Sequence, residues 1–344
     1  MSKALRLPLK PTVTREVRKL GFVEEGTALA ELAGDMLRVL DTADRPDRSR
    51  RQADSSERKI AMSTKEQTAA EEHHTPMEAW DAIASDYDAH VAPGEAGMAT
   101  EALRLAGLKA GDRFLDVAAG PGGLGLPAAR LGATVVATDW SPQMIAAFEA
   151  RVRQEGLSGA EGRVMDCHAL DFADNSFDIT GSQFGVMLVP DQQRALREMV
   201  RVTKPGGRVL LIAYGNPAQF EALHLFIDAL RSVVPDFEGL PEDPPPLEFQ
   251  VSDPKVLRAR LEQAGLTDVT VDTAHQERVE LRFGQQLWDW CLAGNPIPGM
   301  LVADLSDDRK AAVKRNLEAM IHERKNDTGV AIVTAPLNIG IGIK

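Results

Sequence analysis

From residue 76 onward, short apolar runs alternate with stretches that have helical spacing. The apolar runs are predicted to be strands, at residues 113–117, 134–138, 163–165, 177–181, 208–213 and 269–271. The stretches between them are predicted to be helices, at residues 124–131, 141–155, 191–202 and 253–265. Pro205-Gly206-Gly207 is predicted to be a turn. This alternation predicts a mostly parallel sheet with helices on both faces.

Two stretches interrupt the alternation, at residues 217–251 and 283–325. The first has a helix-like half followed by Pro-Glu-Asp-Pro-Pro-Pro, and the second has two helical segments. Insertions at one end of a sheet can build binding walls or lids, or they can simply extend the core. The sequence leaves both interpretations open.

The first 75 residues have a different composition. Residues 1–41 contain apolar positions at helical spacing, which predicts an amphipathic helix in an N-terminal extension. Residues 42–75 are charged and polar, so we expect a flexible linker before a catalytic domain at residues 76–344. The helix could join two subunits in a homodimer, cover the active site or pack on the sheet. Met62 is an alternative start of the chain.

Charge separates these regions. The 344 residues carry a formal charge of −12, but residues 1–62 hold 13 Lys and Arg against 10 Asp and Glu, so the remainder carries −15. An acidic domain is not expected to bind nucleic acid by neutralising phosphates. The sequence has no apolar run of about 20 residues and no secretory signal, which predicts a cytoplasmic protein without a membrane span. Cys167 and Cys291 offer no metal-binding cluster.

A glycine-rich turn follows the first predicted strand. Gly120, Gly122 and Gly125 satisfy the GxGxxG pattern, which is typical of turns that approach a nucleotide. A nicotinamide-dependent oxidoreductase would show the same pattern. However, Asp116 stands at the strand end just before the glycines, where a carboxylate would repel a pyrophosphate and attract a cationic amine or sulfonium.

Two more acids stand at the ends of the next strands. Asp139 could accept hydrogen bonds from both ribose hydroxyls, and Asp166 could accept from an exocyclic amine while Cys167 offers its backbone N–H. Strand ends in such a sheet face one crevice, so these acids suit a nucleoside that carries an amino acid and no phosphate. The alternatives are that Asp139 caps a helix, Asp166 serves a turn, and Trp140 and Met144 only pack.

These runs resemble the class I S-adenosylmethionine-dependent methyltransferases. The matching runs are residues 114–123, 135–144, 162–170, 175–183 and 204–208. Residues 80–88 and 184–187 are most similar to the ubiquinone/menaquinone-type small-molecule branch. Ala118 stands where the family has its first glycine. The resemblance implies a Rossmann-like, seven-stranded, mostly parallel sheet with helices on both faces and helical insertions near the C-terminus.

The resemblance also implies a role for each matched position. Asp116 and the backbone of Ala118, Gly120 and Gly122 would hold the methionine moiety of S-adenosylmethionine. Asp139 would bind the ribose, Trp140 and Met144 would flank the adenine, and Asp166 and Cys167 would contact its edge. The backbone of Gln183 would bind the methionine amine, and Tyr87 would close over the cofactor.

The predicted activity is methyl transfer to a small-molecule acceptor, with C- or O-methylation favoured. No general base is identified, and Tyr87 and His224 are the candidates. The alternatives are a nicotinamide-dependent oxidoreductase and a non-catalytic module that binds S-adenosylmethionine. No metal site is expected.

Overall fold

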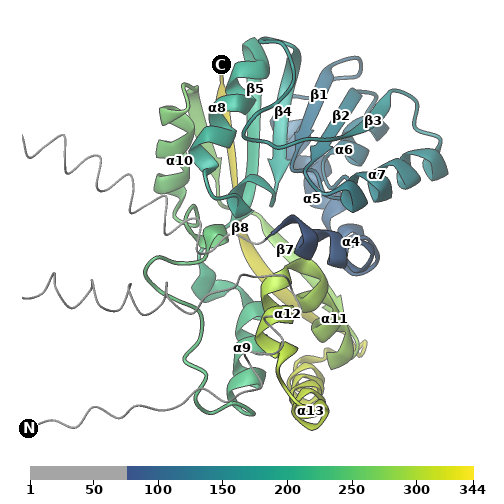
Figure 1. Ribbon diagram of the computed structural model, residues 1–344, viewed down its shortest axis with the longest axis vertical. Coiled ribbons are helices and arrows are strands. Elements are labelled where there is room, and N and C mark those ends of the chain that lie inside the picture. Colours follow the sequence, from purple (N-terminus) through teal and green to yellow (C-terminus); the bar gives the residue numbers. More distant parts are fainter. Residues whose placement is uncertain (1–75) are drawn as a thin grey trace, which may run out of the picture. The chain divides into compact units, whose positions relative to one another are not determined.

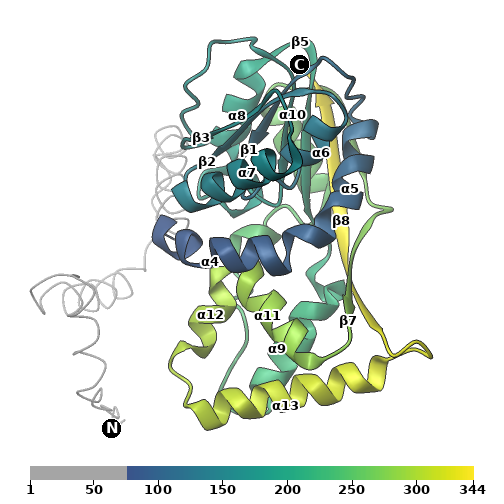
Figure 2. The same ribbon diagram turned by 90° about the vertical axis from the view of Figure 1, so that its right-hand side faces the viewer.

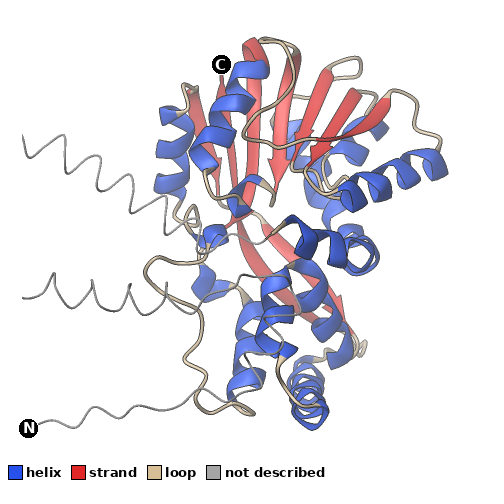
Figure 3. Cartoon of the chain, viewed as in Figure 1, coloured by secondary structure: helices blue, strands red, loops and turns tan. Residues whose placement is uncertain are grey.

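The computed structural model describes residues 76–344, and its centre is a twisted sheet (Figures 1 and 3). The strand order is β3-β2-β1-β4-β5-β8-β6, and β7 pairs with β8 beside this path. Strands β1 to β5 pair in parallel, whereas β8 is antiparallel to β5, β6 and β7. The strand bounds are β1 Arg113–Val117, β2 Thr134–Asp139, β3 Ala160–Val164, β4 Phe177–Gln183, β5 Thr203–Tyr214, β6 Thr267–Asp272, β7 Gln276–Leu281 and β8 Ala331–Ile343.

Helices cover both faces of this sheet, as the alternating pattern predicts. Helices α5, α6 and α7 pack on one face, and α8 and α10 on the other (Figures 1 and 2). Helix α4 leads into α5 and packs against α7. The helix bounds are α4 Met77–His90, α5 Ala92–Leu105, α6 Gly125–Arg130, α7 Pro142–Glu155, α8 Gln192–Val202 and α10 Pro254–Gln263. Ser141 caps α7 by accepting a hydrogen bond from the Met144 backbone N–H at 3.1 Å.

The two insertions form a separate helical layer with its own apolar core. Helices α9 (Glu221–Arg231), α11 (Gly284–Gly294), α12 (Pro296–Ala303) and α13 (Asp307–Arg324) pack with β7 and the first half of β8. Figure 2 shows α13 along the outer edge of this layer, away from the parallel sheet. A Cβ added at Gly284 would lie 2.2 Å from the Glu318 backbone nitrogen, so α11 and α13 approach closely at this glycine. We call this part the helical layer.

Four predictions about elements need correction. The sheet has eight strands rather than seven, because β7 and β8 near the C-terminus add antiparallel pairs. Strand β3 spans Ala160–Val164 rather than 163–165. The Pro-Gly-Gly run is part of β5, where an irregularity in the pairing with β4 absorbs the extra residues. Residues 283–325 contain three helices rather than two, because Asn295 caps α12 separately through the Ile297 backbone N–H.

Predictions for the N-terminal part lie outside the described residues. These are the helix within residues 1–41, the linker at residues 42–75 and the homodimer through that helix. Within residues 76–344, no helix combines the length and the apolar character that crossing a membrane requires.

Candidate active site

The carboxyl ends of β1, β2, β4 and β5 meet helix α4 and the helical layer at one large pocket. Most of the sequence-predicted binding residues line this pocket, although they come from well-separated segments of the chain. They are Tyr87, Ala118, Gly120, Asp139, Trp140, Met144, Asp166, Cys167 and Gln183. The parallel strand order therefore brings the predicted residues to one place.

Three predicted residues do not line the pocket. Asp116 is buried beneath the glycine turn, and its Oδ2 accepts a hydrogen bond from the Gly125 backbone N–H at 2.6 Å. Gly122 has a φ of 101° inside the turn, and an added Cβ would lie 2.5 Å from the Phe148 ring. Both residues therefore shape the turn from within. His224 is exposed on α9, and its Nε2 lies 3.0 Å from the Pro217 carbonyl oxygen, so the geometry gives it no access to the pocket.

Asp139 holds two loops together at the pocket wall. Its Oδ2 accepts from the Gly120 backbone N–H and its Oδ1 from the Ser141 backbone N–H, both at 2.9 Å. The side chain thus contributes to the start of α7 while it also lines the pocket. Burial raises the pKa of Asp139 to about 6 despite these backbone donors. The carboxylate is ionised above that pH and can accept further hydrogen bonds from a ligand.

The Asp166–His168 segment has an internal turn and an inert thiol. Asp166 Oδ1 accepts from the His168 backbone N–H at 2.9 Å and lies 2.7 Å from His168 Nδ1. Burial raises the pKa of Asp166, but these His168 contacts outweigh it, and the net pKa lies below its usual value. Burial raises the pKa of Cys167 to about 12, so its thiol stays protonated and is not a nucleophile at neutral pH.

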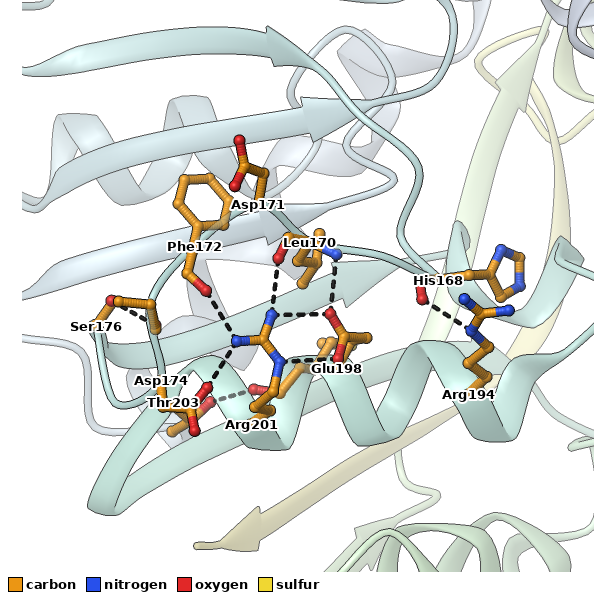
Figure 4. A network of polar contacts seen from close by, with 12 residues as sticks. His168, Leu170, Asp171, Phe172, Asp174, Ser176, Arg194, Glu198, Arg201 and Thr203 are labelled. Atoms are coloured by element: carbon orange, nitrogen blue, oxygen red, sulfur yellow. Dashed lines mark hydrogen bonds and ion pairs between the residues drawn. The ribbon is translucent and has the colours of Figure 1, made fainter.

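An arginine network fixes the loop that carries this segment (Figure 4). Arg201 on α8 donates to the carbonyl oxygens of Leu170 at 2.7 Å and Phe172 at 2.8 Å. It also pairs with Glu198, whose other oxygen accepts from the Leu170 backbone N–H at 2.9 Å. The loop after β3 is therefore attached to α8 by the side chains of both Arg201 and Glu198. This attachment positions Asp166 at the pocket.

We expect Arg201→Met to lower the free energy of unfolding by about 2 kcal/mol, because the variant leaves two loop carbonyls and Glu198 without their charged donor. Urea denaturation measures this change. The matched control is Arg153→Met, whose contact with Glu149 is a surface pair at 3.6 Å and should change stability by less than about 0.5 kcal/mol. Equal unfolding midpoints for the two variants would contradict the assigned role of Arg201.

The structure adds Glu95, Glu277 and Tyr214, which sequence reasoning missed, and it places Glu95 beside the predicted Tyr87. Glu95 on α5 is 3% exposed and lines the pocket, where it accepts a hydrogen bond from the Tyr87 hydroxyl at 3.0 Å. Glu277 on β7 is 5% exposed and accepts from the Tyr214 hydroxyl at 3.0 Å. Burial raises the pKa of Glu95 to about 7 and that of Glu277 to about 8.

A sequence signal for both acids exists in hindsight. Glu95 shares a helical face with the buried Ala99, Ala102 and Leu103, and Glu277 shares a strand face with the buried Leu281. A carboxyl on an otherwise apolar face is unusual enough to suggest function, because an acid is almost never fully buried without a partner.

The other half of the pocket is mostly apolar, with Glu248 and Asn295 as polar residues in its lining. The helical layer supplies aromatic and aliphatic side chains that face the predicted cofactor residues across the cavity. They include Phe220, Leu223, Phe226, Phe249, Trp290 and Leu301. Among the described residues that line the pocket, none is Lys or Arg. The pocket therefore combines an acidic half at the strand ends with an apolar half at the helical layer.

This arrangement is an α/β domain with acidic side chains at the carboxyl edge of its parallel strands. Residues 115–211 match the family model of the methyltransferase domain. The chain is 34% identical to a ubiquinone/menaquinone biosynthesis C-methyltransferase of Bdellovibrio bacteriovorus over 142 residues, which cover 40% of this chain and 59% of that protein. It is 33% identical to a demethylmenaquinone methyltransferase of Paenarthrobacter aurescens over 170 residues, which cover 47% of this chain and 65% of that protein.

An uncharacterized protein of Mycobacterium tuberculosis is 45% identical over 112 residues, which cover 33% of this chain and 40% of that protein. The chain thus spans about 40% to 65% of the length of these curated relatives. The crystal structure of the YcgJ protein from Bacillus subtilis aligns with a TM-score of 0.47 at 19% identity, covering 73% of this chain and 97% of that chain. Residues 115–211 are therefore similar to methyltransferase domains, and the chain is similar over part of its length to methyltransferases of the ubiquinone/menaquinone type.

The pocket fits the cofactor of this class. S-Adenosylmethionine carries a sulfonium, an ammonium and a carboxylate, so its net charge is positive, and it has no phosphate. The acids Glu95, Asp139 and Asp166 line the pocket. A Cβ added at Gly123 would lie 3.1 Å from Glu95 Oε2 and 3.2 Å from Gln183 Nε2, so both polar groups stand directly over the glycine turn. A cation with a ribose and an exocyclic amine matches this donor and acceptor set.

Proposed function

We propose that this protein transfers a methyl group from S-adenosylmethionine to a small, apolar acceptor, with oxygen or carbon as the methylated atom. The observation that carries the proposal is the two-sided pocket, which has carboxyls at the strand ends and aromatic side chains opposite them. The matched methyltransferase domain supports the same reaction. When bound, S-adenosylmethionine supplies an electrophilic methyl group on a positively charged sulfur.

The residues of the chain would bind and orient the reactants. Asp139 would accept from the ribose, and Glu95 with Gln183 would receive the ammonium above the glycine turn. Asp166 and the backbone of Cys167 would contact the adenine, flanked by Trp140 and Met144. The apolar half would exclude water and hold the acceptor close to the reacting carbon, which supplies much of the rate in a direct displacement.

The domain organisation belongs to the same proposal. We infer a catalytic domain at residues 76–344, preceded by an extension at residues 1–41 and a linker at residues 42–75. The extension is the proposed contact of a homodimer, and an acidic catalytic domain supports a protein that does not bind nucleic acid.

Titration calorimetry on the full chain tests the cofactor. We expect S-adenosylmethionine and S-adenosylhomocysteine to bind with micromolar dissociation constants, whereas NAD should release no binding heat, because the described pocket residues include no lysine or arginine for its pyrophosphate, and the acids there would repel it. Formation of S-adenosylhomocysteine with a set of small apolar acceptors then tests catalysis. Binding of NAD in preference to S-adenosylmethionine would overturn the proposed function.

A further inference from the structure

A hydrogen-bonded pair of buried groups stands at the border between the two halves of the pocket. Tyr214 is the last residue of β5 and lines the pocket, whereas Glu277 on β7 does not line it. The Tyr214 hydroxyl donates to Glu277 Oε2 at 3.0 Å. The Tyr214 hydroxyl therefore links the pocket to Glu277 by a hydrogen bond. None of the cofactor contacts proposed above uses this pair.

Two aromatic rings fix the position of Tyr214. Phe184 stacks on its ring with the centroids 4.6 Å apart, and Phe220 lies at 4.6 Å in a tilted arrangement. Phe184 directly follows Gln183, and Gln183 pairs with Ile212 in the parallel register of β4 and β5. Tyr214 therefore lies at the same sheet edge as the cofactor residues, next to Gln183, while Phe220 belongs to the apolar half. The phenol stands where a cofactor at the strand ends and an acceptor in the apolar half would meet.

The groups around the pair carry no compensating cation. The titratable groups that act on Glu277 are Tyr214 and Glu95, and those that act on Tyr214 are Glu277, Tyr87 and Glu95. On β8, Glu277 faces Ala335. Helix α11, which also packs against β7, carries Asp289, bonded to Gln285 at the surface, and the buried Cys291. Burial raises the pKa of Glu277 to about 8, close to the pH at which a biological base must work.

The apolar half limits the chemistry of the acceptor. Phe220, Phe226, Phe249 and Trp290 give this side of the pocket aromatic surfaces. A ring system packs well on such surfaces. An acceptor with a carboxylate or phosphate would place a negative charge near Glu95 and Glu277, with no described lysine or arginine in the pocket to balance it.

We propose that the acceptor is an uncharged, ring-containing alcohol or phenol, and that its hydroxyl binds to Tyr214, which relays the hydroxyl proton to Glu277. This inference rests on the methyl-transfer function proposed above. The acceptor oxygen forms a bond to the methyl carbon as the carbon–sulfur bond breaks, and the sulfur keeps the electron pair. The acceptor proton passes to Tyr214 Oη while the Tyr214 proton passes to Glu277 Oε2. Tyr214 is thus the catalytic residue, and Glu277 acts through it.

The test uses 2-naphthol as the probe and 2-naphthoic acid as its anionic counterpart. Binding to the full chain saturated with S-adenosylhomocysteine is measured by calorimetry, and formation of 2-methoxynaphthalene from S-adenosylmethionine is measured between pH 6 and pH 9. We expect 2-naphthol to bind at least about 10-fold more tightly than 2-naphthoate. The wild-type kcat should rise with pH to a plateau above about 8, because Glu277 must be ionised to accept the proton.

Three variants distinguish a proton relay through Tyr214 and Glu277 from a purely structural role of these two residues. Tyr214→Phe should lower both the affinity for 2-naphthol, about 10-fold, and kcat, about 100-fold. Glu277→Gln should leave KM within about 3-fold, lower kcat about 100-fold and remove the rise with pH. Glu280→Gln, an exposed acid on the same strand, should match the wild type. Binding of S-adenosylhomocysteine, measured first, shows that each variant is folded.

Each other result has a defined meaning. Tighter binding of 2-naphthoate, no binding or methylation of 2-naphthol, or an unchanged pH profile in Glu277→Gln would overturn the relay and its acceptor class while the cofactor site stands. Failure of the wild-type protein to bind S-adenosylmethionine would instead overturn the proposed function itself.

Discussion

Replacing Asp139 by alanine is expected to weaken S-adenosylmethionine binding by at least about 100-fold. The variant loses a charged acceptor for the ribose, and such hydrogen bonds contribute about 1.5–3 kcal/mol each. It also leaves the backbone N–H groups of Gly120 and Ser141 without their acceptor, which loosens the glycine turn against the start of α7. Calorimetry at pH 8 measures the effect, because the pKa of Asp139 is about 6 and its carboxylate is then ionised.

Two further variants test whether the charge of Asp139 is required for cofactor binding and whether the effect is specific to this acid. Asp139→Asn keeps one oxygen acceptor without the charge, so it should bind the cofactor between the wild type and Asp139→Ala. Asp171→Ala removes an exposed acid from the loop after β3 and should bind as tightly as the wild type. The affinity of the wild type should fall as the pH drops below about 6, because protonation of Asp139 removes its charge. An Asp139→Ala protein that binds within threefold of the wild type would refute this role.

The parallel half of the fold follows from local signals in the sequence. Strands β1 and β2 are buried runs, and their boundaries are set by the glycine turn and by the Ser141-Pro142 helix start. These signals lie within a few residues of each other, so they can be recognised in the sequence without knowledge of the tertiary fold. Once the order of the strands is known, the carboxyl ends of β1, β2 and β4 must meet at one edge, and the predicted binding residues meet with them.

The antiparallel half depends on contacts between distant residues. Strand β8 lies at the C-terminus, yet its last part pairs with β5 and β6 while its first part pairs with β7. Its Gly340 and Gly342 weaken any local strand signal, but in the fold they allow close packing of Leu257, Leu261 and Leu266. No short-range pattern reports such pairings.

The same reasoning explains the missed acids. Glu95 and Glu277 are separated by 182 positions in the sequence, and only the packing of α5 against β7 brings their carboxyls into electrostatic contact. Asp116 is the opposite case. Its place at a strand end predicts a ligand contact, but in the fold its carboxylate accepts the Gly125 N–H within the turn. A strand-end acid can thus act on the ligand by shaping the loop.

Replacing Gly185 by alanine is expected to abolish detectable cofactor binding. Gly185 follows β4 and lines the pocket beside the glycine turn. A Cβ at this position would lie 2.3 Å from the Ala118 carbonyl oxygen and 2.6 Å from the Ala118 Cβ. Backbone atoms cannot rotate away as a flexible side chain can, so the two loops must separate. We expect a loss of at least about 2 kcal/mol in unfolding free energy, typical of overpacking, together with the loss of calorimetric heat for S-adenosylmethionine.

Gly97→Ala is the matched control, because Gly97 is exposed on α5 with open space around an added Cβ. That variant should bind normally and gain about 0.5–1 kcal/mol of stability from the better helix former. Ala118→Gly in the Gly185→Ala background distinguishes the two contacts. It removes the Ala118 Cβ and the strain of its left-handed φ of 52°, but it leaves the carbonyl oxygen in place. Binding should therefore recover only in part, and full recovery would show that the backbone contact does not close the site.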